Sequence, residues 1–386
     1  MSDWREMTLA DISSDISYGY TESAKSEKIG PKFLRITDIA NGRLNWDTVP
    51  YCPISVEDFV KYKLSPGDIV VARTGATTGA NYIIKNNDPT EAVFASYLIR
   101  YRIDQSYADP NFIGQVLRSI TWQDYVDSIA GGSAQPGANA KQLGSFPILL
   151  PPLPEQRAIA SVLSSLDNKI DLLHRQNKTL EAMAETLFRQ WFVEEADEGW
   201  EEGKLPDEFV FTMGQSPSGN SFNEDGIGIP MFQGNADFGF RFPTERVYTT
   251  EPTRLAEPMD VLISVRAPVG AQNMALNRCC IGRGVSAFRY RKNPSFFTYA
   301  FFKLRSLMTE IKQFNNEGTI FGSIGKTDFE GIDITIPPNS TVEKFEKECG
   351  PINIKVIENC TQIRTLKKLR DTLLPKLISG EVRVEV

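Results

Sequence analysis

The most constraining feature of the sequence is an uninterrupted heptad pattern between residues 159 and 191. Apolar residues recur there at spacings that alternate between four and three, which is the a/d seam of a coiled-coil helix. A proline-rich stretch at residues 151–154 comes directly before the pattern, and proline suits the first turn of a helix. Such a helix spans roughly 55–60 Å, and a seam of this length needs a partner helix.

The partner is predicted in the same chain, because residues 345–377 repeat the alternation. We expect the two helices to form an antiparallel coiled coil. Each seam carries one asparagine near its middle, Asn177 and Asn359, and a buried Asn opposite an Asn can fix the register. Registers shifted by seven residues also satisfy the heptads, so the pairing of Asn177 with Asn359 is a hypothesis.

The sequence before each helix is the same type of unit. The strand-like run 67–73 ends in an arginine and a glycine-containing turn, and the run 259–266 repeats this pattern. We predict an α+β fold in which two α/β domains are joined by two long helices with approximate two-fold symmetry. The predicted segments are a domain at 1–150, a helical spacer at 151–196, a second domain at 197–336 and a second spacer at 337–386.

Composition excludes several classes of protein. No stretch of about 18 apolar residues occurs, so no membrane span is expected. The five cysteines lack a CxxC spacing and read as reduced thiols, which predicts a cytoplasmic protein. The single histidine, His174, falls on the flank of the first long helix, which disfavours zinc sites and histidine-based triads. We therefore expect no metal and no catalytic residue.

The distribution of charge favours nucleic acid as a partner, although the formal net charge is −7. No Asp or Glu occurs between residues 261 and 306. All charged side chains of this stretch, called the basic block below, are positive. Acidic residues concentrate instead after the first long helix. The members of the basic block are Arg266, Arg278, Arg283, Arg289, Arg291, Lys292, Lys303 and Arg305.

Two kinds of segment are candidates for DNA contact. The loops 132–141 and 318–326 are rich in small residues and end in lysine, which suits phosphate. Arg73 and Arg266 each stand at a glycine-containing turn and suit phosphate or guanine. A plain connecting loop and an ion pair within the domain are the competing interpretations. The candidate DNA-binding residues are Arg73, Thr74, Gln135, Asn139, Lys141, Arg266, Arg278, Arg283 and Lys326.

One motif suggests an enzyme. Residues 293–296, Asn-Pro-Ser-Phe, resemble the Asn-Pro-Pro-Tyr/Phe motif of amino-methyltransferases, but the third position is Ser295. No GxGxxG-type cofactor loop accompanies it. The repeat counterpart at 109–112, Asp-Pro-Asn-Phe, favours a helix start with Asp or Asn as the cap. A self-sufficient DNA adenine methyltransferase is therefore a disfavoured alternative.

Two runs carry a family resemblance. The run PPLPEQRAIA at residues 151–160 and the run LLPKLISGEV at 373–382 resemble the conserved helical regions of HsdS, the specificity subunit of type I restriction-modification systems. The likeness extends over the whole order of domain, helix, domain and helix. The second copy departs from it, because residues 337–340 read PPNS where the first copy has PPLP.

The resemblance implies a non-catalytic subunit with two target-recognition domains, each reading one half of a bipartite, asymmetric site in double-stranded DNA. It implies two HsdM methyltransferase subunits and HsdR restriction subunits as partners. S-adenosylmethionine, ATP and Mg²⁺ would belong to those partners, with no cofactor in this chain. The competing interpretation is a coiled-coil adaptor that does not bind DNA.

Overall fold

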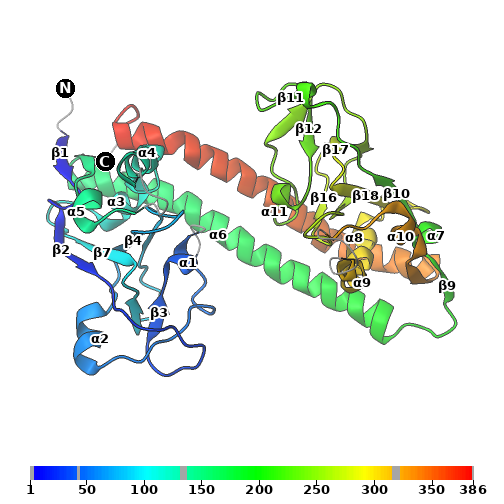
Figure 1. Cartoon of the computed structure of the whole chain (residues 1–386), viewed down its shortest axis with the longest axis horizontal. Coiled ribbons are helices and arrows are strands. Elements are labelled where there is room, and N and C mark those ends of the chain that lie inside the picture. Colours follow the sequence, from blue (N-terminus) through cyan, green and yellow to red (C-terminus); the bar gives the residue numbers. More distant parts are fainter. Residues whose placement is uncertain (1–3, 41–43, 131–136, 315–321, 385–386) are drawn as a thin grey trace. The chain divides into compact units, whose positions relative to one another are not determined.

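The structure is a computed structural model of the 386-residue chain, and it describes every residue except 1–3, 41–43, 131–136, 315–321 and 385–386. The chain divides into two compact units. Unit 1 contains Met1–Ile170 and Thr365–Val386, and unit 2 contains Asp171–Arg364. Both divisions fall inside long helices (Figure 1), so each unit combines one globular domain with a segment of both helices.

The domain of unit 1 is built on a four-stranded antiparallel sheet in the order β2-β7-β4-β5. Two small pairs flank it, β3 with β6 in parallel and β1 with β8 antiparallel. Its elements are β1 (Arg5–Thr8), β2 (Ser13–Tyr18), β3 (Lys32–Leu34), α1 (Ile36–Ile39), α2 (Val56–Tyr62), β4 (Asp68–Ala72), β5 (Asn81–Ile83), β6 (Ala92–Phe94), β7 (Leu98–Ile103), α3 (Pro110–Val116), α4 (Ile120–Ala130), α5 (Ala140–Gly144) and β8 (Pro147–Leu150).

Strand β4 shows why the domain has two cores. Side chains alternate between the faces of a strand, and both faces of β4 are buried. Ile69 and Val71 belong to a cluster that includes Leu163 from the first long helix. Val70 belongs to a second cluster, which includes Phe94 from the parallel pair. The sheet is thus held between the helices on one side and the β3·β6 layer on the other.

The domain of unit 2 has a four-stranded antiparallel sheet in the order β10-β18-β15-β16 and a mixed sheet in the order β11-β13-β12-β17-β14. Strands β9 and β19 form a separate antiparallel pair. Its elements are β9 (Glu201–Lys204), α7 (Leu205–Glu208), β10 (Phe209–Met213), η2 (Gly219–Ser221), β11 (Phe222–Asn223), β12 (Ile229–Phe232), η3 (Asn235–Asp237), β13 (Val247–Thr249), β14 (Leu255–Ala256), β15 (Val261–Ser264), β16 (Gln272–Met274), β17 (Cys279–Ile281), β18 (Val285–Tyr290), α8 (Phe297–Ser306), α9 (Met308–Gln313), α10 (Lys326–Gly331) and β19 (Asp333–Ile336).

The two domains share one topology. The order β10-β18-β15-β16 repeats β2-β7-β4-β5, and the parallel pair β12·β17 repeats β3·β6. The outer pair β9·β19 repeats β1·β8, joining the first and last strands of each domain. The α+β class and the internal repeat predicted from the sequence are confirmed. Unit 2 adds strands β11, β13 and β14, for which the described part of unit 1 has no counterpart in the sheet order.

The two long helices are α6 (Leu153–Arg189), which continues into the π-helical turn η1 (Gln190–Glu194), and α11 (Asn339–Ser379). Within unit 2 the ring of Trp191 lies 6.1 Å from that of Phe345. Asn177, which precedes Trp191 on its helix, contacts Asn359, which follows Phe345 on the other helix. One helix therefore ascends in residue number as the other descends, which makes the pair antiparallel. No helix in the described chain is apolar over a long enough stretch to span a bilayer.

Candidate nucleic-acid interface

Each domain joins the two central strands of its four-stranded sheet with the same ion pair. Arg102 Nε lies 2.8 Å from Asp68 Oδ1 in unit 1, and Arg289 Nε lies 2.6 Å from Asp260 Oδ1 in unit 2. Both aspartates also accept a hydrogen bond from the backbone N–H three residues earlier. The hydrogen bonds to these carboxylates raise the pKa of Arg102 and of Arg289 above the ordinary value. Asp68 and Asp260 are therefore equivalent positions.

This equivalence corrects the match between Arg73 and Arg266. Counting from the two aspartates, Thr74 corresponds to Arg266, and Arg73 corresponds to Val265. The backbone agrees, because Thr74 forms an antiparallel bridge to the 132–141 loop and Arg266 forms one to the 318–326 loop. The apolar run of unit 2 extends one residue further, since the side chain of Val265 joins the hydrophobic core.

Arg73 and Arg266 also differ in environment. Arg73 is half-buried, its Nε donates a hydrogen bond to Ser96 O at 3.1 Å, and its guanidinium lies 5.1 Å from the centre of the Tyr18 ring. Arg266 is exposed and forms no ion pair with any residue that the structure describes. Arg73 therefore positions the turn that contains Ser96, while Arg266 is available to a ligand.

The candidate residues of the first small-residue loop have different roles. Asn139 caps α5: its Oδ1 accepts a hydrogen bond from Gln142 N at 2.9 Å, and Gln142 Oε1 accepts one from Asn139 N at 3.0 Å. Lys141, in the first turn of α5, is exposed. Gln135 lies outside the described residues. Asn139 thus has a structural role in ending the loop, which leaves Lys141 as the exposed cation of this segment.

Two of the other candidate cations form surface ion pairs. Arg278 Nε lies 3.1 Å from Glu257 Oε1, and Lys326 Nζ lies 3.4 Å from Glu330 Oε1. The side chains of Arg278 and Lys326 are 60% and 69% exposed, and pairs this exposed contribute at most about 1 kcal/mol. Neither pair would hold its cation away from a phosphate.

The basic block is only partly a surface for a ligand. Arg289 binds Asp260, and Arg305 NH1 lies 2.8 Å from Glu181 Oε1. Lys303 is buried and donates to Thr335 O at 2.8 Å, and Arg291 donates to Pro206 O. Four members of the basic block are therefore engaged within the fold, because acids and carbonyls from other segments reach these cations although no acid lies near them in the sequence.

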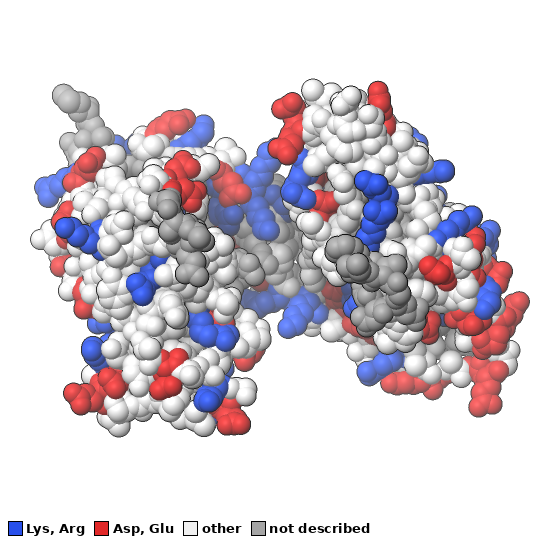
Figure 2. All heavy atoms as spheres, in the orientation of Figure 1, with Lys and Arg blue, Asp and Glu red and all other residues white. Residues whose placement is uncertain are grey.

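Figure 2 supports the same reading of the charges. On the face drawn there, basic and acidic side chains are interspersed over each domain. Acidic side chains gather near strand β9, close to the acidic segment that follows α6. No single-signed basic surface covers this face of either domain.

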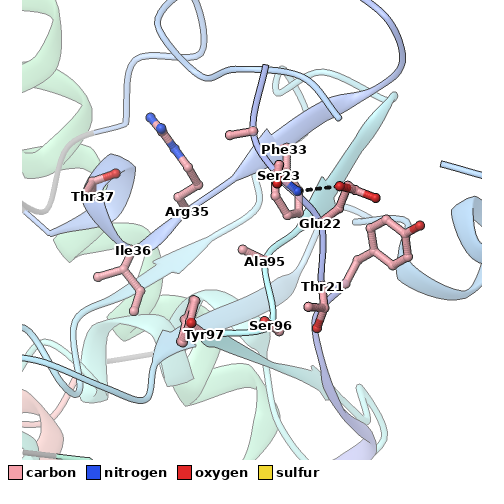
Figure 3. A pocket seen from close by; sticks show the side chains of 12 residues that line it. Thr21, Glu22, Ser23, Phe33, Arg35, Ile36, Thr37, Ala95, Ser96 and Tyr97 are labelled. Atoms are coloured by element: carbon pink, nitrogen blue, oxygen red, sulfur yellow. Dashed lines mark hydrogen bonds between the residues drawn. The ribbon is translucent and has the colours of Figure 1, made fainter. Parts of the chain in front are cut away.

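A hollow in unit 1 was not predicted from the sequence. It has a volume of about 620 Å³ and is formed by three segments, residues 20–24, 33–37 and 95–97 (Figure 3). Phe33 and Ala95 are buried there, while Tyr97 is 58% exposed. Its lining carries several hydroxyl groups, one guanidinium and one carboxylate, from Tyr20, Thr21, Glu22, Ser23, Arg35, Thr37, Ser96 and Tyr97.

Arg35 is held in place at this hollow. Its Nε and NH2 donate to the two oxygens of Asp38, at 3.1 and 2.9 Å. The hydrogen bonds to Asp38 raise the pKa of Arg35. Ser96 and Tyr97 form the turn between β6 and β7 that Arg73 fastens. Only the position of these segments after the short strands β3 and β6 could have pointed to them, since none contains a recognisable motif.

The motif resembling a methyltransferase signature forms a turn. Asn293 Oδ1 accepts hydrogen bonds from Ser295 N at 3.0 Å and Ser295 Oγ at 2.7 Å. Helix α8 begins only at Phe297, so Asn293 is not its cap. Asp109, by contrast, caps α3 as the sequence predicted. The Asn293 side chain is therefore occupied in local structure.

The structure brings together the two asparagines of the helix seam. Asn359 Nδ2 donates to Asn177 Oδ1 at 2.8 Å, and Asn177 Nδ2 donates to Cys360 Sγ at 3.3 Å. Both asparagines are buried, and burial raises the pKa of the Cys360 thiol to about 11. This polar pair lies among apolar seam residues, where a shift in register would leave both amides without partners.

The domain of unit 2 is tied to this part of α6 by a buried charge cluster. Glu181 Oε1 accepts from Arg241 NH2 at 3.2 Å and from Arg305 NH1 at 2.8 Å. The guanidinium of Arg241 lies 3.8 Å from the centre of the Phe301 ring. Burial lowers the pKa of Arg241 to about 10, although Glu181 opposes the shift. The cluster fixes how the domain of unit 2 sits on its own helix segment.

Several known proteins are similar to this chain in sequence. Residues 1–182 match the family model of the type I restriction modification DNA specificity domain. The chain is 30% identical to the MjaX specificity subunit of a type I restriction enzyme from Methanocaldococcus jannaschii, over 99% of this chain and 94% of that protein. It is 27% identical to the MjaIX specificity subunit of the same organism, over 83% of this chain and 76% of that protein.

A solved structure supports the fold alone. The crystal structure of a type I restriction-modification system S subunit from M. genitalium superposes with a TM-score of 0.62. The superposition covers 98% of this chain and 96% of that one, at 19% sequence identity. Both domains and both long helices therefore have counterparts in that protein.

Proposed function

Because the chain belongs to the specificity subunits of type I restriction enzymes, we propose that it reads a bipartite, asymmetric site in double-stranded DNA for such an enzyme. In this proposal the chain is non-catalytic and selects the sequence on which its partners act. Each domain reads one half of the site, and the paired helices set the gap between the halves.

One observation carries the proposal: the two domains share a topology but present different side chains at equivalent places. Arg266 of unit 2 stands where unit 1 has Thr74, and the turn after β17 carries Arg283 where that after β6 carries Ser96. Base edges in the major groove are distinguished by the donor and acceptor pattern of the facing side chains. Two such domains are therefore suited to two different half-sites.

The expected partners follow from the family to which the chain belongs. We propose two HsdM methyltransferase subunits and, for cleavage, HsdR restriction subunits, with the exposed flanks of α6 and α11 as docking surface. S-adenosylmethionine would be bound by HsdM, and ATP with Mg²⁺ would serve HsdR. Among the candidate DNA-binding residues, the exposed cations Lys141, Arg266, Arg278, Arg283 and Lys326 would contact DNA directly. Arg73, Thr74 and Asn139 would hold the loops in position.

The test is to express the chain with the methyltransferase subunit encoded beside it and map methylated adenines across the host DNA. The expected result is a split motif with a fixed gap and two different halves, absent when the chain is omitted. A palindromic motif would contradict the proposed asymmetry. Copurification with the methyltransferase without salt-dependent duplex binding would favour a coiled-coil adaptor instead.

A further inference from the structure

The turn between β17 and β18, residues 282–284, is the counterpart in unit 2 of the turn at residues 95–97. Backbone hydrogen bonds establish the match: Val265 N donates to Gly284 O at 2.9 Å, as Arg73 N donates to Tyr97 O at 3.1 Å. In addition, Gly282 N donates to Phe232 O as Ala95 N donates to Leu34 O. Arg283 therefore occupies the place of Ser96.

The backbone holds Arg283 in a defined position. A Cβ on Gly284 would lie 2.1 Å from Gln233 O, and a Cβ on Gly282 would lie 3.3 Å from Ser216 Oγ. The turn is thus packed directly against the segments that follow β10 and β12. A side chain at Gly284 would clash with the backbone, and one at Gly282 would require its neighbours to shift. The backbone N of Arg283 donates to Ser216 Oγ at 3.3 Å.

The side chains around this turn are suited to bases. Arg283 is exposed and forms no ion pair within the described chain, and the neighbouring strand ends carry the exposed amides of Gln215 and Gln233. A guanidinium can donate two parallel hydrogen bonds to guanine O6 and N7, and a glutamine amide suits adenine. A contact to phosphate, by contrast, does not depend on the DNA sequence, so a residue with that role would be expected in both domains. Unit 1 has the uncharged Ser96 at this position.

We propose that Arg283 is a specificity-determining residue and that the half-site read by unit 2 contains a guanine contacted by its guanidinium. This role of Arg283 rests on the proposed function. The amides of Gln215 and Gln233 lie beside Arg283 and contact the adjoining base pairs.

The test compares methylation motifs of the wild-type chain and of Arg283→Ser, each expressed with the methyltransferase subunit. The substitution introduces the residue that unit 1 has at this place, and because the side chain is exposed the thermal unfolding midpoint should not change. One guanine position in one half-site should become degenerate, with discrimination there falling roughly 10- to 100-fold. The other half-site should be unchanged.

Two further variants separate base contact from charge. Arg283→Lys keeps the charge and loses the bidentate fork, so it should also relax that one position. Lys292→Ser removes an exposed cation of the same domain that is not among the candidate DNA-binding residues, and it should leave the motif intact. Uniform weakening on all sequences by Arg283→Ser, with a salt slope reduced by about one and full rescue by Lys, would show a phosphate contact and overturn the inference.

An unchanged motif in Arg283→Ser would overturn the inference as well. Failure of the proposed function looks different, because then the wild-type chain itself would direct no methylation motif.

Discussion

Strand β4 of unit 1 is entered through Gly67 and strand β15 of unit 2 through Met259, yet both residues have a positive φ, 88° and 69°. Such a backbone conformation is free for glycine and costs a side-chain-bearing residue about 1 kcal/mol or more. The turn is the same because the next residue is in each case the buried aspartate bound to an arginine of the central strand. The ion pair across the sheet, and not the preference of the turn residue, fixes this geometry.

The edges that we propose to contact DNA show the reverse case, because the order of their strands is the same in both units while their surfaces differ. In unit 1 the segments after β3 and β6 stand apart around a hollow of about 620 Å³. In unit 2 the equivalent segments touch, since no Cβ fits between Gly284 and Gln233. The residues inside the domain are thus constrained by the shared fold, whereas the residues at the edge are free to differ.

The largest expected effect comes from breaking the shared anchor. Asp68→Ala and Asp260→Ala should each lower the free energy of unfolding of their own unit by about 1–3 kcal/mol, because two charge-assisted hydrogen bonds and the acceptor of a backbone N–H are lost. Amide hydrogen exchange on the full chain, read at β4 and at β15, measures both losses. A large loss in only one unit would break the equivalence of the two anchors.

A smaller effect is expected from exchanging the turn residues. Gly67→Met should destabilise unit 1 by about 1 kcal/mol, because its φ of 88° disfavours any side chain. The matched variant Met259→Gly should relieve strain while losing the packing of Met259 on its core, so its net change should be smaller. Thermal unfolding of the two variants decides this, and a larger loss in Met259→Gly would contradict the argument.

The smallest effect concerns the polar contacts on the helix pair. Although burial opposes the shift, the hydrogen bond from Gln115 and the charges of Arg118 and Arg370 hold the pKa of Asp167 below its ordinary value. A lowered pKa in the folded state stabilises unit 1 above the unfolded pKa of about 4, and this contribution is lost as pH falls through the lower folded value. The neutral pair Asn177–Asn359 of unit 2 contributes no such dependence.

Asp167→Asn should therefore flatten part of the acid dependence of unit 1 and leave unit 2 unaffected. Hydrogen exchange of α6 between pH 3 and pH 6, read separately on each side of Ile170, measures this, with the exposed Asp124→Asn as control. An equal change on both sides would mean that Asp167 does not act locally.

The sequence was sufficient for those parts of the fold that are periodic or repeated. The heptads predicted both long helices, since a period of 3.5 residues is a local signal, and the repeated strand-and-turn pattern predicted two domains of one topology. Even here Arg73 and Arg266 were matched one residue out of register. The reason is that Val265 continues the apolar run into the core, which only the cross-sheet pairing reveals.

The site was far less predictable. The exposed cations Arg266 and Arg283 belong to the same basic block as Lys303 and Arg305. The side chains of Lys303 and Arg305, however, bind other residues of the domain and helix segment of unit 2. Composition cannot separate these two groups, because their partners come from distant segments. The surroundings of Arg283 are likewise assembled by the parallel pairing of β12 with β17, which joins residues about 50 positions apart.

The central claim is that each unit reads its own half of one DNA site, and a domain exchange tests it most directly. Residues 197–336 would be replaced by the corresponding domain of a relative, and methylated adenines would be mapped with the unchanged methyltransferase subunit. The account predicts that one half of the motif changes while the other half and the gap are kept. A change in both halves, or in neither, would contradict it.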